Sequence, residues 1–151
     1  MTARWRPARA DEAGPLRDLQ RLADLAGLGE VFPPDRFPFP DDDVLTRWVL
    51  VLADPEVSVE VVDGPDGLLA VTAYDATTLR HLAVRPDAWG TGLGRAGVER
   101  AVAAGARHLA VLEANHRARR LYELLGWRPT GVTTECPWPP HPVELEYALP
   151  A

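Results

Sequence analysis

The sequence predicts a single α/β domain, in the broad sense that includes α+β folds, and three stretches of its 151 residues carry that prediction. Residues 57–74 form two apolar runs around a turn and predict a β-hairpin. Leu79–Val84 is a strand-like run that leads into a glycine-rich loop and a helix, and residues 108–125 repeat the order of strand and helix. A chain of this length buries one sizeable core, so we expect residues 1–151 to form one domain.

Turn and cap signals place the remaining elements. Four prolines within residues 30–43 predict a loop, and Asp41, Asp42 and Asp43 at its end are typical of a helix start. Asp11 or Gly14 is the expected cap of the first helix. The expected order is a strand at 4–8, helices from about 15 to 27–29 and at 44–53, strands at 57–62, 68–74 and 79–84, a helix at 92–104, a strand at 108–113, a helix at 116–125, and strands at 127–134 and 143–149.

Composition excludes several classes of protein. The chain has no apolar run of 18 residues and no apolar signal core at its start, so we expect a cytoplasmic protein that does not contact a membrane. A single cysteine, Cys136, offers neither a disulfide nor a metal cluster. The net charge of −6 argues against nucleic acid as a partner. The acidic excess lies in residues 1–75, which hold 15 acids and 7 arginines, whereas residues 76–151 hold 7 acids and 9 arginines.

The loop WGTGLG, residues 89–94, has the composition of an anion-binding turn. Glycines let the backbone approach a ligand closely, and the helix that follows presents unpaired N–H groups. Gly92, Gly94 and Gly97 also satisfy the dinucleotide pattern G-x-G-x-x-G, with Glu113 where a ribose-binding acid belongs. Seven residues separate Val84 from the first of these glycines, which is too many for that turn, and a P-loop needs a lysine that this chain lacks.

The second block, NHRARRLYELLGW at residues 115–127, resembles the N-x-x-A-x-x-L-Y-E-x-x-G-[FW] stretch of the GCN5-related N-acetyltransferases, the GNAT family. The order of elements resembles that family over nearly the whole chain, including VELEYAL as its last strand. The resemblance implies a central mixed, mostly antiparallel, twisted sheet of six to seven strands with about four flanking helices, splayed at the cofactor site. It also implies an acetyl-CoA-dependent N-acetyltransferase that acts on a primary amine, either a small molecule or a peptide, without a metal.

The resemblance assigns residues to the acetyl-CoA site. Backbone groups of the strand before the loop would pair with the pantetheine arm, and loop N–H groups would receive the pyrophosphate. Trp89 departs from the family pattern, which has Gln or Arg there, so phosphate binding would rest more on the backbone. Arg117, Arg119 and Arg120 include one further phosphate candidate. The cofactor-binding residues implied are Leu82, Ala83, Val84, Trp89, Gly90, Thr91, Gly92, Leu93, Gly94, Arg95, Asn115 and Tyr122; for Asn115 a plain helix cap is the alternative.

The resemblance also implies the chemistry. Tyr122 occupies the position of the acid that protonates the departing thiolate, and core packing is its alternative role. For the general base we consider His81, with Glu60 and Asp75 near the same strands, against a water relay with no direct base. The branch that acetylates ribosomal-protein N-termini has a Glu where this chain has Ala110. No acyl-enzyme nucleophile stands out, so we expect direct attack in a ternary complex.

Three expectations concern the partners of the chain. Residues 30–43 and 134–142 are the expected walls of an acceptor site, and an acidic rim at residues 41–43 would favour a cationic amine over an acidic acceptor. A non-catalytic domain that binds or senses acyl-CoA is the alternative to an enzyme. Homodimer formation is compatible with the sequence but is not fixed by it.

Overall fold

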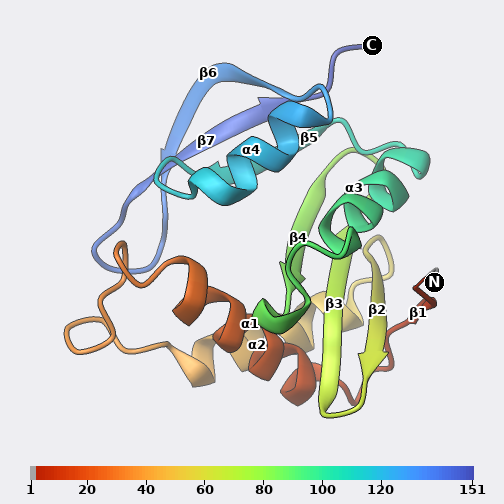
Figure 1. Cartoon of the computed structure of the whole chain (residues 1–151), viewed down its shortest axis with the longest axis vertical. Helices are drawn as coiled ribbons and strands as arrows, with labels where there is room; N and C mark the ends of the chain where they lie inside the picture. The colour runs from red at the N-terminus through yellow and green to blue at the C-terminus, as the bar shows by residue number, and fades with distance from the viewer. Residues whose placement is uncertain (1–2) are drawn as a thin grey trace.

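A computed structural model describes residues 3–151 as seven strands, four α-helices and one short 3-10 turn (Figure 1). Every expected element is present in the expected order. The elements are β1 (Trp5–Pro7), α1 (Ala13–Gly27), α2 (Asp41–Ala53), β2 (Ser58–Gly64), β3 (Gly67–Tyr74), β4 (Leu79–Val84), η1 (Pro86–Ala88), α3 (Leu93–Ala103), β5 (His108–Leu112), α4 (His116–Leu124), β6 (Arg128–Glu135) and β7 (Val143–Ala148).

The strands form two antiparallel sheets that diverge from a common point. The first has the order β1-β2-β3-β4 and the second the order β5-β7-β6. They meet where Thr78 makes a parallel bridge to His108, and the Thr77 carbonyl accepts hydrogen bonds from the N–H groups of Arg107 and His108. Beyond this point β4 and β5 separate, as Figure 1 shows. The predicted splayed sheet of six to seven strands is therefore confirmed as four strands plus three.

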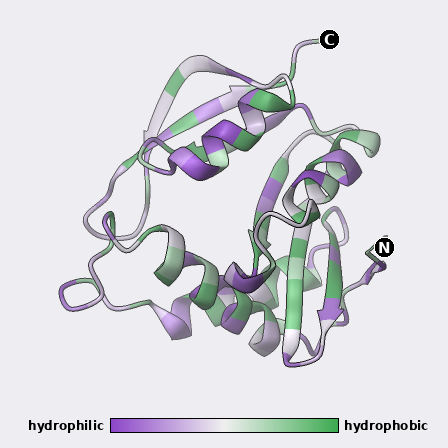
Figure 2. Ribbon diagram, in the orientation of Figure 1, coloured by the Kyte–Doolittle hydropathy of each residue, from purple (hydrophilic) through white to green (hydrophobic). Residues whose placement is uncertain are grey.

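Helices cover both faces of the first sheet. Val61 and Val71 pack against α1 and α2 on one face, while Val62 and Ala70 face Leu93 of α3 on the other. Burial on both faces explains why β3 is apolar along most of its length (Figure 2). The second sheet carries α4, whose apolar side chains join a separate core cluster.

The two helices of the first half begin slightly earlier than their cap signals predict. α1 starts at Ala13 with Glu12 as its N-cap residue, where Asp11 or Gly14 was expected. α2 starts at Asp41, so the three aspartates form its first turn instead of preceding it. Carboxylates in a first turn are stabilised by the partial positive charge of the helix N-terminus, which accounts for the earlier start of α2. Over residues 3–151 none of the helices is long and apolar enough to cross a membrane.

Candidate functional site

A cleft of about 290 Å³ opens where the two sheets diverge. Its walls come from the free edge of β4, the loop and first turn of α3, the inner face of α4 and the C-terminal half of α1. Eleven of the residues that the sequence nominated lie along it: Leu82, Ala83, Val84, Trp89, Gly90, Gly92, Leu93, Gly94, Arg95, Asn115 and Tyr122. Thr91 and His81 are not among the lining residues. The fold thus brings together segments that are up to 40 positions apart in the sequence.

The edge of β4 offers backbone groups to this cleft. The Arg85 N–H donates to the Leu69 carbonyl at 2.8 Å, and Ala70 stands opposite Val84 in the register. Because hydrogen-bonding direction alternates along a strand, the N–H and C=O groups of Leu82 and Val84 point away from β3. This free edge is able to accept an extended ligand as an added strand.

The glycine-rich loop turns the chain sharply into α3. Gly90 and Gly92 have φ values of 79° and 89°, which are left-handed conformations that favour glycine. Gly92 is the N-cap residue, and the first helical bond runs from the Ala96 N–H to the Gly92 carbonyl. The N–H groups of the first turn are therefore available to an anion. Gly94 has a different role, because a Cβ there would lie 3.2 Å from Leu121 of α4.

Trp89 fills part of the cleft and forms part of its wall. Its indole N–H donates to the Val84 carbonyl at 2.8 Å, and the ring lies close to Gly27 of α1. The Arg117 guanidinium lies over the same ring, 3.6 Å from its centroid. Burial and the neighbouring Arg120 lower the pKa of Arg117, although an arginine stays charged at neutral pH. Arg117 therefore places a cation beside the Trp89 ring in the wall of the cleft.

Residues of α4 complete the cleft. Asn115 caps the helix, because its side-chain oxygen accepts from the Ala118 N–H at 3.2 Å, and it lines the cleft as well. Tyr122 packs in the core with Trp127 and Tyr147, each ring centroid 6.3 Å away, and it also reaches the cleft. Burial raises the pKa of the Tyr122 phenol, which keeps its proton in place at neutral pH. Asn115 thus both caps α4 and lines the cleft, and Tyr122 both packs in the core and lines the cleft.

The candidates for a general base on the strands are engaged elsewhere. His81 packs against Trp48 of α2 with ring centroids 4.7 Å apart and ring planes tilted by 44°, and burial lowers the pKa of His81 to about 4. Glu60 accepts hydrogen bonds from Tyr74 and Arg100. Asp75 accepts from backbone N–H groups in the turn that follows it. None of these three lines the cleft, so the geometry gives no support to them as bases.

Asp24 of α1 is a cleft residue that the sequence did not reveal. It lies in the wall of the cleft and also in the wall of a second cavity of about 310 Å³. Burial raises the pKa of its carboxyl to about 6, and a hydrogen bond from Gln20 at 3.3 Å opposes part of that rise. On the sequence, Asp24 is one more polar residue of an amphipathic helix, and no motif marks it.

The second cavity lies between α1 and the two loops that were expected to form an acceptor site. Most of its wall is aromatic or proline: Phe32, Phe37, Pro38, Phe39, Pro40, Trp138 and Pro139. The expected acidic rim does not contribute to this lining. Asp41 pairs with Arg21 instead, and Asp42 and Asp43 are exposed in the first turn of α2.

The sequence pattern of the acetyltransferase (GNAT) family matches residues 16–127. The chain belongs to this family. No curated protein matches it in sequence. Three similar solved structures show the shared GNAT fold at low identity. Apo YjaB from Escherichia coli is 22% identical, with a TM-score of 0.74 over 98% of this chain and 97% of that one.

The other two similar structures are both acetyltransferases. An acetyltransferase from Thermus thermophilus is 21% identical, with a TM-score of 0.70 over 100% of this chain and 98% of that one. The PaiA N-acetyltransferase from Thermoplasma acidophilum, solved in complex with coenzyme A, is 13% identical, with a TM-score of 0.64 over 97% and 98% of the two chains. Within residues 3–151 of the GNAT chain, no group of three or more His, Cys, Asp or Glu side chains is placed to hold a metal ion.

Proposed function

We propose that this GNAT protein transfers an acetyl group from acetyl-CoA to a primary amine by direct attack within a ternary complex. The observation that carries the proposal is one cleft in which the free edge of β4, the open first turn of α3 and the Tyr122 phenol lie together. Family membership supports acetyl transfer, and the coenzyme A complex of the Thermoplasma PaiA structure supports the choice of donor.

Each wall of the cleft has a part in the proposed reaction. The outward backbone groups of Leu82 and Val84 pair with the pantetheine arm, which requires the Trp89 indole to release the Val84 carbonyl. The first-turn N–H groups of α3 receive the pyrophosphate, with Arg117 as the nearby cation. The amine nitrogen attacks the thioester carbonyl, the C–S bond breaks, and Tyr122 gives its proton to the departing thiolate.

A matched pair of variants at Gly92 tests the phosphate site. Gly92→Asn and Gly92→Asp place side chains of similar size at the same left-handed φ of 89°, where nothing else lies within 4 Å. They differ in charge, so the backbone strain cancels in the comparison. We expect calorimetry to show that Asp weakens acetyl-CoA binding several-fold more than Asn, with equal melting temperatures. Equal affinities of the two variants for acetyl-CoA would show that the phosphate groups do not bind at this loop.

Tyr122→Phe tests the chemical step. The variant keeps the ring that packs with Trp127 and Tyr147 and removes only the hydroxyl. We expect kcat to fall roughly 10- to 1,000-fold with little change in the KM for acetyl-CoA. A wild-type kcat in Tyr122→Phe would show that Tyr122 has a packing role only. Tight acetyl-CoA binding with no turnover of any amine would instead support the non-catalytic alternative.

A further inference from the structure

Asp24 stands at the junction of the two cavities. It lines both the cleft at the splayed sheet edge and the aromatic cavity beside it, and it is the one residue that the two linings share within residues 3–151. A substrate that fills the aromatic cavity and reaches into the cleft therefore passes beside Asp24. Asp24 is therefore placed to contact the reacting nitrogen of an acceptor that occupies the aromatic cavity.

Neighbouring side chains fix the orientation of this carboxylate. The Trp48 indole N–H donates to Gln20 Oε1 at 2.9 Å, which turns the amide NH₂ group of Gln20 toward Asp24. Gln20 Nε2 then donates to Asp24 Oδ2 at 3.3 Å. His81 packs against the Trp48 ring in a tilted arrangement. One carboxylate oxygen is thus held by a neutral donor, and the carboxylate retains the capacity to accept from a ligand.

The chemistry of the aromatic cavity defines what would occupy it. Its wall contains three phenylalanines, one tryptophan and three prolines, which favour a flat apolar group. Its polar members on the α1 side are Gln20 and Asp24. Arg36 is exposed, and its guanidinium lies 5.7 Å from the ring centroid of Phe37. An apolar wall with a carboxylate at its inner end complements an ammonium group attached to an apolar body.

We propose, resting on the acetyltransferase function above, that the acceptor is a primary amine with an aromatic or similarly sized apolar group, and that Asp24 binds its ammonium and takes its proton. The apolar group occupies the aromatic cavity, and the nitrogen projects past Asp24 into the cleft. Asp24 is a catalytic residue in this scheme, whereas Gln20 and Trp48 are positioning residues.

The protons balance in this scheme. The ammonium transfers one proton to the Asp24 carboxylate, and the neutral nitrogen attacks the thioester carbonyl to form the C–N bond. The C–S bond then breaks, and the thiolate receives the Tyr122 proton. The second nitrogen proton returns to the Tyr122 oxygen through water, and Asp24 releases its proton to solvent. The products are an N-acetyl amine, free coenzyme A and one proton.

The pH profile separates this role from a structural one. In the two linings, the charged and titratable groups besides Asp24 are Arg36, Arg95, Arg117 and Tyr122. Cys136 of the adjoining loop interacts with Asp24, and Arg47, Glu144 and His141 lie around that thiol. The arginines stay charged, and burial raises the pKa of both the Tyr122 phenol and the Cys136 thiol, so Asp24 is the lining residue that changes charge between pH 5 and 8. We therefore expect kcat/KM for the amine to rise to a plateau above pH 7 in the wild type.

Asp24→Asn tests the base directly. The variant should lower kcat/KM for 2-phenylethylamine at pH 7.5 by 100-fold or more, with acetyl-CoA affinity unchanged within about threefold. Its kcat/KM should rise about tenfold per pH unit up to pH 9, because only the rare free amine then reacts. A variant that keeps the wild-type plateau, or loses less than about threefold, would overturn the role of Asp24.

Acceptor preference tests the cavity without any change to Asp24. We expect wild-type kcat/KM for 2-phenylethylamine to exceed that for ethylamine by about 10- to 100-fold, with glutamate the poorest. Trp138→Ala should remove most of this difference by lowering kcat/KM for 2-phenylethylamine. A preference for ethylamine or glutamate over 2-phenylethylamine would overturn this inference about the acceptor. The proposed acetyltransferase function would still stand if the protein bound acetyl-CoA and acetylated any of these amines. Failure to bind acetyl-CoA would instead refute the proposed function.

Discussion

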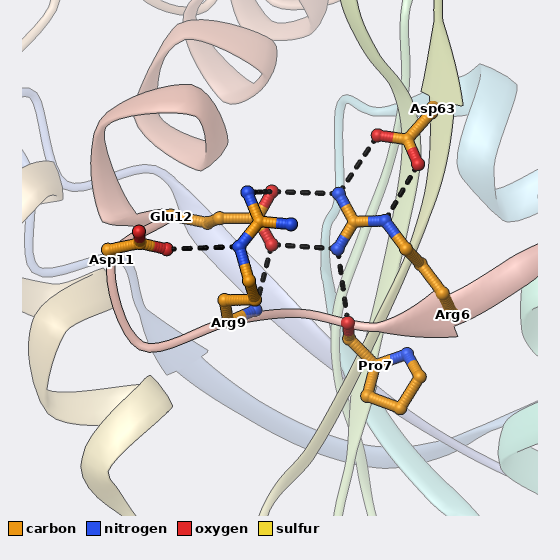
Figure 3. Close-up of polar contacts among 6 residues, drawn as sticks. All are labelled: Arg6, Pro7, Arg9, Asp11, Glu12 and Asp63. Carbon is orange, nitrogen blue, oxygen red and sulfur yellow. Dashed lines mark hydrogen bonds and ion pairs between the residues drawn. The ribbon is translucent and has the colours of Figure 1, made fainter.

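Two carboxylates near opposite ends of α1, the buried Glu12 and the half-buried Asp24, lie in different electrostatic settings. Glu12, just before its first residue, is 4% exposed and accepts two hydrogen bonds from the Arg6 guanidinium, at 2.8 and 2.9 Å (Figure 3). The Arg9 N–H adds a third hydrogen bond at 2.7 Å. Asp24, near the other end, receives its hydrogen bond from a neutral amide at 3.3 Å. One acid is compensated by charge and the other is not.

The pKa values of the two groups move in opposite directions. The hydrogen bonds from Arg6, opposed in part by burial, lower the pKa of Glu12, and burial raises the pKa of Asp24 to about 6. A paired carboxylate stabilises the fold when it is charged, whereas a desolvated carboxylate with no cation destabilises it. Perturbed acids of the second kind gather at functional sites because a base needs a pKa near the working pH. The difference between the two residues is what separates a structural ion pair from a candidate base.

Breaking the Glu12 pair should have the largest effect on stability. Arg6→Met leaves Glu12 buried without its main cation, and we expect a loss of about 4 kcal/mol in the free energy of unfolding, read from denaturant titration. Arg9→Met is the matched control, because Arg9 is 65% exposed and lies 3.6 Å from the same carboxylate. It should cost less than about 1 kcal/mol. Equal losses in the two variants would contradict the structural role given to the Arg6 pair.

Neutralising Asp24 should stabilise the protein, and the effect depends on pH. The folded state holds this proton more tightly than the unfolded chain, whose pKa is 3.8, so unfolding free energy falls as pH rises from about 4 to about 6. Asp24→Asn removes that penalty. We expect the variant to be more stable than wild type by about 2–3 kcal/mol at pH 8, with no difference below pH 4.

Glu12→Gln should show the opposite dependence. A lowered folded-state pKa contributes stability above the unfolded value of 4.5, and this stability is lost as pH falls through the folded value. The variant should therefore be the less stable one at pH 7 and approach wild type in acid. Thermal melts from pH 3 to 8 check both variants. Curves that shift in the same direction would mean that the two carboxylates do not differ as described.

The parts of the molecule that could be predicted from the sequence are those that a local sequence pattern determines. Strand β4 was predicted at its observed bounds because an apolar run and a glycine-rich loop delimit it locally. Most of the residues that line the cleft were nominated for the same reason, since they lie in two contiguous stretches of the sequence. Helix starts moved by two or three residues because backbone geometry and tertiary contacts decide between neighbouring cap candidates.

Long-range packing decided the parts that the sequence did not predict. His81 lies on a strand that borders the cleft, yet the alternation of side chains turns it onto Trp48, and only the structure places α2 there. Asp24 becomes a cleft residue because α1 packs against β4, a contact between segments about 60 positions apart in the sequence. The desolvation of the Asp24 side chain depends on this tertiary contact, so no local sequence pattern could predict it.

The neutral relay to Asp24 should have a moderate effect. Gln20→Met removes the donor to Asp24 and the acceptor of the Trp48 indole N–H, so we expect a loss of about 1 kcal/mol in stability. The same change should raise the pKa of Asp24 further, because the hydrogen bond from Gln20 lowers it. The rise of kcat/KM with pH should then move to higher pH than in wild type. An unchanged profile would show that Gln20 does not position the carboxylate.

The smallest effect is expected at the exposed arm of the Arg6 pair. Asp63 accepts from Arg6 Nε at 2.7 Å, but its side chain is 62% exposed, so water and salt screen the interaction that Glu12 makes in a buried setting. Asp63→Asn should cost less than about 1 kcal/mol at low salt, and the cost should vanish near 1 M sodium chloride. The penalty of Arg6→Met should persist at that salt because Glu12 stays buried. Denaturant titrations of both variants at 0.05 and 1 M salt measure this difference directly. If the stability loss of Arg6→Met also disappeared at high salt, the interaction of Arg6 with Glu12 would be screened by solvent in the same way as its interaction with Asp63.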